Sequence, residues 1–174
     1  MERKIYVLIG PKGSGKSFIG SIMERCCNII FFRVEDIWQS LRNEKNYLSE
    51  NDYFRNIDNF CREGNLILIN EIRRLLQSNK SIVIESLGIT PHFPSFLDNL
   101  QLMAEVFLIK IVADLNVCLE RVKMRDQSIH IPISDDTIKE INKRVHQLTM
   151  DYSFEIINND LDEEDIIAQL KEKM

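Results

Sequence analysis

The 174-residue chain has few of the residues that mark special classes of protein. It contains only four cysteines and no C-x-x-C pair, so we expect reduced thiols in the core rather than disulfides or zinc. Its three histidines are scattered singly, without a metal ligand at suitable spacing. No apolar run approaches transmembrane length and no signal peptide precedes the first predicted strand, so we expect a cytoplasmic protein without membrane contact.

An excess of basic residues is also absent. The chain has 22 Lys and Arg against 27 Asp and Glu, which gives a formal net charge of −5. Proteins that bind nucleic acid usually present a basic face, so this balance argues against a nucleic-acid partner. The length and the ordinary content of apolar residues fit one domain over residues 1–174. Nothing in the sequence indicates the oligomeric state.

Glycine is scarce too, but three of the six glycines stand close together in residues 10–17. This stretch fits the phosphate-binding pattern G-x-x-x-x-G-K-[ST] at every position. A β-branched apolar run over residues 4–9 precedes it, and apolar residues at helical spacing follow it through Cys26. Strand, glycine loop and helix together form the arrangement that holds a nucleoside triphosphate. The predicted nucleotide-binding residues are Gly10, Pro11, Lys12, Gly13, Ser14, Gly15, Lys16 and Ser17.

The chemistry of this loop follows from its residue types. Glycine lets the backbone curl so that successive N–H groups point at phosphate oxygens, and the helix that begins near Lys16 adds its positive dipole end. We expect the Lys16 ammonium to reach the β and γ phosphates and the Ser17 hydroxyl to bind Mg²⁺.

Alternation of apolar and helical patterns along the rest of the chain predicts an α/β fold. Further strands are expected over 29–32, 82–86, 106–112 and 154–157. Helices are expected around 37–41 and over 49–78, 95–103, 115–124 and 135–148, and again after Asp162, with a break in the second of them at Gly64-Asn65. Such an order predicts a parallel sheet between two helical layers, with ligands at the carboxyl ends of the strands.

Two pairs of polar residues follow predicted strands and are therefore candidates for the acceptor side of a site. Glu35 and Asp36 follow the second strand, where a carboxylate can take a proton from an acceptor hydroxyl or help to hold the water shell of the metal, and Asp36 is the preferred residue. Glu85 closes the third strand and could order metal-bound water or contact the acceptor, and Ser86 could bind Glu85 or the substrate. Helix capping and ion pairing are the structural alternatives for these acids.

Basic residues supply the remaining candidates. Arg121 and Arg125 share one helix face at i, i+4 spacing and lead into a loop, from which they could stabilise a phosphoryl group in transfer. A solvated helix face is the alternative. Arg55 lies in the helical region where an acceptor would bind, although a surface role fits it equally well.

Taken over nearly its whole length, the chain resembles the small P-loop kinases of the nucleoside monophosphate kinase and shikimate kinase group. The resemblance implies a three-layer α/β/α P-loop fold with a five-stranded parallel sheet of order 2-3-1-4-5. It also implies an acceptor-binding helical region over about 36–80, a lid over about 125–134, and transfer of the γ-phosphoryl group of ATP with Mg²⁺. Arg121 would lie near the adenine or the phosphates, Arg125 near the transferring group, and Asn158 and Asn159 beside the adenine.

The acceptor is not determined by these motifs. Asp36 and the segment Phe54–Asp58 are similar to elements of shikimate kinases, but the sequence Ser86-Leu87-Gly88 lacks their glycine triplet. The Asp-Gly-Phe-Pro of nucleoside monophosphate kinases is also absent. The Glu35-Asp36 pair, the R-x-x-x-R spacing and Pro132 are similar to polynucleotide 5′-hydroxyl kinases.

We therefore interpret the protein as an ATP-dependent kinase of a small acceptor, such as a nucleotide, a nucleoside or a metabolite hydroxyl. A polynucleotide 5′-hydroxyl kinase is one alternative. The other is a nucleotide-dependent switch or slow hydrolase without a small acceptor, although the chain has no N/T-K-x-D base-recognition motif.

Overall fold

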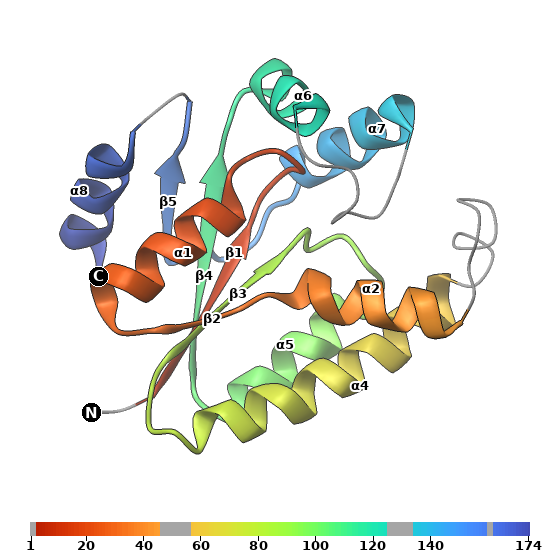
Figure 1. Cartoon of the computed structure of the whole chain (residues 1–174), viewed down its shortest axis with the longest axis vertical. Helices are drawn as coiled ribbons and strands as arrows, with labels where there is room; N and C mark the ends of the chain where they lie inside the picture. The colour runs from red at the N-terminus through yellow and green to blue at the C-terminus, as the bar shows by residue number, and fades with distance from the viewer. Residues whose placement is uncertain (1–2, 46–56, 125–133, 160–161) are drawn as a thin grey trace.

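A computed structural model describes residues 3–45, 57–124, 134–159 and 162–174 (Figure 1). Its five parallel strands form one sheet of order β2-β3-β1-β4-β5, which confirms the predicted order. The strands are β1 (Lys4–Ile9), β2 (Ile30–Phe32), β3 (Ile82–Ser86), β4 (Glu105–Val112) and β5 (Phe154–Ile157). The helices are α1 (Lys16–Cys27), α2 (Val34–Glu44), α4 (Ile57–Leu76), α5 (Phe93–Gln101), α6 (Leu115–Lys123), α7 (Asp135–His146) and α8 (Glu163–Lys173).

Two apolar cores fix the three layers. On one face of the sheet α1 and α8 bury Ile19, Ile22 and Leu170 against the strands. On the other face α4 and α5 bury Ile72 and Leu100. Within the described part of the chain, no helix has both the length and the apolar character that crossing a membrane requires.

The parallel register determines where the loops meet. Ile9, the last residue of β1, is paired with Ser86 of β3 on one side and with Lys110 of β4 on the other. The loops that leave β1 and β3 therefore start at the same edge of the sheet, with α6 and α7 above them (Figure 1). This edge is the place where open parallel sheets bind their ligands.

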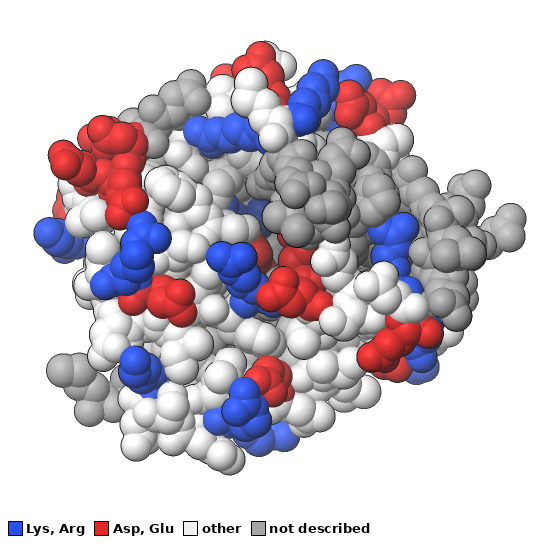
Figure 2. Space-filling model, viewed as in Figure 1, with Lys and Arg blue, Asp and Glu red and all other residues white. Residues whose placement is uncertain are grey.

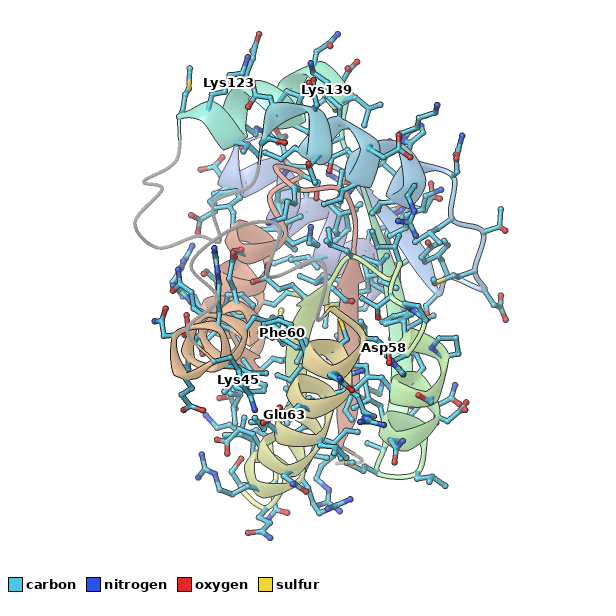
Figure 3. The ribbon with its side chains drawn as sticks, turned by 90° about the vertical axis from the view of Figure 1, so that its right-hand side faces the viewer. Lys45, Asp58, Phe60, Glu63, Lys123 and Lys139 are labelled. Carbon is cyan, nitrogen blue, oxygen red and sulfur yellow. The ribbon has the colours of Figure 1, made fainter. Side chains whose placement is uncertain are left out.

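The predicted break at Gly64-Asn65 is wrong, because α4 runs without interruption from Ile57 to Leu76. Gly64 instead allows α2 to pack closely against α4. A Cβ atom on Gly64 would lie 1.8 Å from Cζ3 of Trp38, so the indole of α2 packs directly on the backbone of α4. Phe60 lies against the same ring, at 5.4 Å between centroids. Lys45, just after α2, and Glu63 of α4 form a 2.8 Å ion pair between the two helices (Figure 3).

Changing Gly64 to alanine is expected to lower the free energy of unfolding by roughly 1–3 kcal/mol, because the added methyl forces the indole out of its place. The gain in helix propensity, about 1 kcal/mol, offsets only part of this. Thermal unfolding measures the loss, and fluorescence of Trp38, the single tryptophan, reports the displaced ring. Asn70→Ala, on the exposed side of the same helix, is the control. Equal stability of the Gly64 variant and wild type, with unchanged fluorescence, would contradict this account of the glycine.

The expectation that all four thiols lie in the core is only half right. Cys61 and Cys118 are buried, whereas Cys26 and Cys27 are exposed. Cys26 and Cys27 form the last two positions of α1, beyond the buried stripe that ends at Met23. Burial, with a smaller contribution from Asp58, raises the pKa of the Cys61 thiol to about 11, so this thiol stays protonated at neutral pH.

Side chains of α8 bind the outer edge of β5. The Gln169 amide accepts from the backbone N–H of Ile157 at 3.0 Å and donates to its carbonyl at 3.1 Å. The Lys173 ammonium donates to the carbonyl of Glu155 at 3.0 Å. The N–H and carbonyl of Ile157 and the carbonyl of Glu155 are therefore paired within the chain and not open to another strand.

Candidate nucleotide and acceptor site

The loop between β1 and α1 has the conformation that its glycines allow. Gly13 and Gly15 have φ of 90° and 87°, in the left-handed region that favours glycine. α1 begins at Lys16 with Gly15 as N-cap, and no described side chain caps it. The N–H groups of the first helical turn thus have the arrangement that binds an anion at a helix N-terminus.

Neighbouring elements enclose this loop closely. A Cβ atom on Gly13 would lie 2.1 Å from the carbonyl oxygen of Cys118 in α6. One on Gly15 would lie 2.2 Å from Nδ2 of Asn158. The side chain of Ser14 is fully buried, and among the described residues its hydroxyl oxygen has no hydrogen-bond partner. An unsatisfied hydroxyl in this loop fits a site built for a polar ligand.

Lys16 is buried beside the loop carbonyls. Its Nζ donates to the carbonyl oxygens of Gly10 at 2.7 Å and of Pro11 at 2.8 Å. The Pro11 carbonyl also accepts from the backbone N–H of Ser14 at 3.1 Å. The ammonium is therefore held within the loop whose amides would bind the phosphates.

Ser17 and Glu85 form the second pairing of the site. The Ser17 hydroxyl donates to Oε2 of Glu85 at 2.8 Å, which joins the start of α1 to the end of β3. Both side chains offer oxygen ligands, the type that Mg²⁺ prefers, so these residues fit the metal that the sequence predicts. Ser86, the next residue, accepts at Oγ from the backbone N–H of Gly88 at 3.1 Å and so shapes the turn after β3.

Arg121 and Asn158 lie together on the α6 side of the loop. Asn158 is buried and its Nδ2 donates to the carbonyl of Ser14 at 2.8 Å. Arg121 donates from Nη1 to the carbonyl of Asn158 at 3.0 Å. Asn159 binds the chain after β4, since its Oδ1 accepts from the backbone N–H of Asp114 at 2.8 Å.

The acids after β2 lie in the first turn of α2, where neither is the N-cap, because Arg33 has that position. Glu35 is half-buried and Asp36 is exposed. Arg55 and Arg125, together with most of the predicted lid, lie outside the described residues. The roles assigned to all of these residues stay predictions.

Asn142 of α7 also contacts the phosphate loop, and no sequence motif indicates it. Its side chain is 1% exposed and makes two hydrogen bonds to Lys12: Oδ1 accepts from the backbone N–H at 2.7 Å, and Nδ2 donates to the carbonyl at 2.9 Å. The available signal was its position, since Asn142 shares the buried stripe of α7 with Ile138 and Val145. A polar residue on an apolar stripe needs a partner.

A cavity of about 460 Å³ lies between the chain after β3 and the end of α7. Gly88, on its wall, packs on Ile9 and so links the cavity to the base of the phosphate loop. The other lining residues combine apolar and polar groups: Ile89, Thr90, Pro91, Phe93, Pro94, Arg144, Gln147, Leu148 and Met150. This mixture suits a small molecule with both an apolar part and an anionic or hydroxyl group.

The charged residues on the face of the molecule seen in Figure 2 are interspersed, with acidic and basic groups side by side. Outside the grey residues, that view shows no continuous basic stripe of the kind that tracks a nucleic-acid backbone.

No protein-family model matches the sequence, and a search of curated proteins finds no match. Solved structures are similar in fold. A protein of Chloroflexus aurantiacus that is provisionally named a kinase matches with a TM-score of 0.72 at 14% identity, over 100% of both chains. Shikimate kinase from Acinetobacter baumannii in complex with shikimate matches with 0.66 at 12% identity, over 99% of this chain and 92% of that one. A sugar kinase from Janibacter sp. matches with 0.64 at 15% identity, over 99% and 94%. The chain therefore has the fold of the small P-loop kinases.

Proposed function

We propose that the protein is a kinase that transfers the γ-phosphoryl group of ATP to a small-molecule acceptor. The observation that carries this proposal is the joined arrangement of Lys16 in the phosphate loop and Ser17 bonded to Glu85. The fold supports it, because the similar structures include shikimate and sugar kinases.

Each residue has a stated task in this proposal. The loop amides and the Lys16 ammonium bind the β and γ phosphates and stabilise the charge that develops in transfer. Ser17 and Glu85 would hold Mg²⁺, Glu85 through water, and the bound metal neutralises phosphate charge. Asp36 accepts the proton of the acceptor hydroxyl while the new P–O bond forms and the bond to ADP breaks. Arg121, which donates to the carbonyl of Asn158, would lie near the bound nucleotide.

The cavity after β3 is the proposed acceptor site. It adjoins the phosphate loop through Gly88 and Ile9, and Arg144 on its wall provides a cation over apolar residues. An acceptor with a carboxylate or phosphate and a free hydroxyl fits this lining.

The test measures ADP release from ATP and Mg²⁺ with a panel of acceptors: nucleosides, nucleoside monophosphates, sugars, shikimate-like alcohols and 5′-hydroxyl oligonucleotides. We expect strong stimulation by one small-molecule class. Stimulation by oligonucleotides alone would replace the proposal with end-kinase activity. Tight ATP binding without stimulation by any acceptor would favour a switch or a slow hydrolase.

Glu85→Gln tests the metal side of the proposal. The amide can still accept from Ser17 but has lost the negative charge, so we expect the Mg²⁺ concentration for half-maximal activity to rise about 10-fold or more. Turnover is measured over a series of Mg²⁺ concentrations at saturating ATP. Glu71→Gln, on the far side of α4 and paired with Arg74, is the matched control. An unchanged Mg²⁺ dependence in the Glu85 variant would remove Glu85 from the metal site.

A further inference from the structure

One peptide unit of the phosphate loop, between Pro11 and Lys12, is held from both sides. Its N–H donates to Oδ1 of Asn142 at 2.7 Å. Its carbonyl, on Pro11, accepts from the Lys16 ammonium at 2.8 Å and from the N–H of Ser14 at 3.1 Å. A trans peptide points its N–H and its C=O in opposite directions, so Asn142 and Lys16 bind opposite ends of one rigid unit.

Asn142 also fixes the next peptide unit. Its Nδ2 donates to the Lys12 carbonyl at 2.9 Å, so the N–H of Gly13, on the other side of that unit, points away from Asn142. Gly13 has φ of 90°, and glycine permits other backbone angles at little cost, so this unit could rotate without a side-chain restraint. The orientation of the Asn142 amide is unambiguous, because Lys12 N–H can only donate and its carbonyl can only accept.

We propose that Asn142 is a positioning residue of the phosphate loop. It orients two successive loop peptides, and through the Pro11 carbonyl it places the Lys16 ammonium for a nucleoside triphosphate. This inference rests on the proposed nucleotide site but concerns a residue that the site chemistry alone does not require. Asn142 belongs to α7, so the geometry of the loop depends on a helix 130 residues further along the chain.

A purely structural role makes a different prediction. Asn142 sits on the buried stripe of α7 between Ile138 and Val145, and a leucine there would supply more apolar contact. If the amide only filled space, a folded leucine variant would bind nucleotide as wild type does. If it positions the loop, nucleotide affinity falls even in variants that stay folded.

The experiment compares the wild-type chain with Asn142→Leu, Asn142→Asp and Asn142→Gln. Titration calorimetry with ATP and Mg²⁺ gives the affinity, and hydrogen exchange over residues 10–17 reports the loop. We expect about 10-fold to 100-fold weaker ATP binding and faster exchange for leucine, because small displacements of a binding group have effects of this size. Aspartate keeps the acceptor for Lys12 N–H and loses the donor, so an intermediate loss is expected. Glutamine keeps both groups on a longer stem and should restore much of the affinity.

Asn70→Leu, the same change on an exposed face of α4, is the matched control and should bind ATP as wild type does. Wild-type affinity in a folded Asn142→Leu or Asn142→Asp protein would overturn the inference while leaving the nucleotide site intact. If leucine prevents folding, aspartate, which has nearly the same shape, decides the question. Absence of ATP binding by the wild type would instead overturn the proposed function.

Discussion

Replacing Lys16 with alanine is expected to lower turnover by at least 10²–10³-fold while the fold persists, since the loss of one donor to developing charge has about this effect. Lys16 is buried and held by the Gly10 and Pro11 carbonyls inside the loop. The ammonium would lie beside the β and γ phosphates, whose charge a loop lysine neutralises during phosphoryl transfer. ADP release under saturating acceptor measures the effect.

Two comparisons make this result interpretable. Lys16→Met retains the apolar stem without the charge, so equal losses in both variants would assign the effect to the ammonium rather than to packing. Lys139→Ala, on the exposed side of α7 and paired only with Asp136 among the contacts described, is the control and should retain turnover. Circular dichroism and thermal unfolding verify the fold of each. Turnover near the wild-type value in Lys16→Ala would remove the phosphate loop from the chemistry.

Gly13→Ala is expected to have the largest effect on the free energy of unfolding. An L residue at φ of 90° is strained by roughly 1–2 kcal/mol, and the new Cβ would lie 2.1 Å from the Cys118 carbonyl oxygen. Because that oxygen belongs to the backbone of α6, relief requires the loop and α6 to separate. We expect a loss of about 3 kcal/mol or more, which for a chain of this size lowers the melting temperature by roughly 6–12 °C. ATP binding should be lost with it.

The Gly88→Ala variant distinguishes backbone strain at positive φ from a steric clash of the added Cβ. Gly88 has a φ of 73°, but the three atoms nearest to its added Cβ would be side-chain carbons of Ile9, Leu148 and Met150 at 3.2–3.3 Å. These side chains can move, so we expect the free energy of unfolding to fall only by the backbone strain, roughly 1–2 kcal/mol. Equal losses at both glycines, measured by thermal unfolding, would show that contact with α6 contributes nothing at Gly13.

Local sequence patterns were sufficient to locate the strands. The β-branched runs predicted all five strands, and the resemblance of the motifs to small P-loop kinases predicted the order 2-3-1-4-5. The helix caps are equally local, since Ser134 and Asp162 each accept from a backbone N–H in the first turn of the helix that follows. These signals are short-range, because capping and periodicity depend on residues only a few positions apart.

The parts that sequence reasoning missed depend on contacts between distant segments. Glycine weakens helices, so the sequence predicts a break at Gly64, and only the position of Trp38 shows that this glycine allows a contact between helices. Asn142 could not be identified from the sequence because it binds the backbone of Lys12. Every residue has a backbone N–H and carbonyl, so residue types do not indicate such a partner. Because ligands bind at the carboxyl ends of parallel strands, the sequence predicts that Ser17 and Glu85 lie near the same edge of the sheet. In the structure the two side chains form a hydrogen bond. Their role in metal binding stays a prediction.

The binding of Gln169 and Lys173 to β5 has a consequence for any shortened form of this chain. Both residues lie in the last two turns of α8, beside the buried Leu170. Removing those turns would uncover apolar surface and, at the same time, free the outward N–H of Ile157 and the carbonyls of β5 to pair with a strand of another molecule. Such a truncation should therefore self-associate through strand addition rather than merely lose a helix. The final turns of α8 are what keeps this sheet from growing beyond its fifth strand.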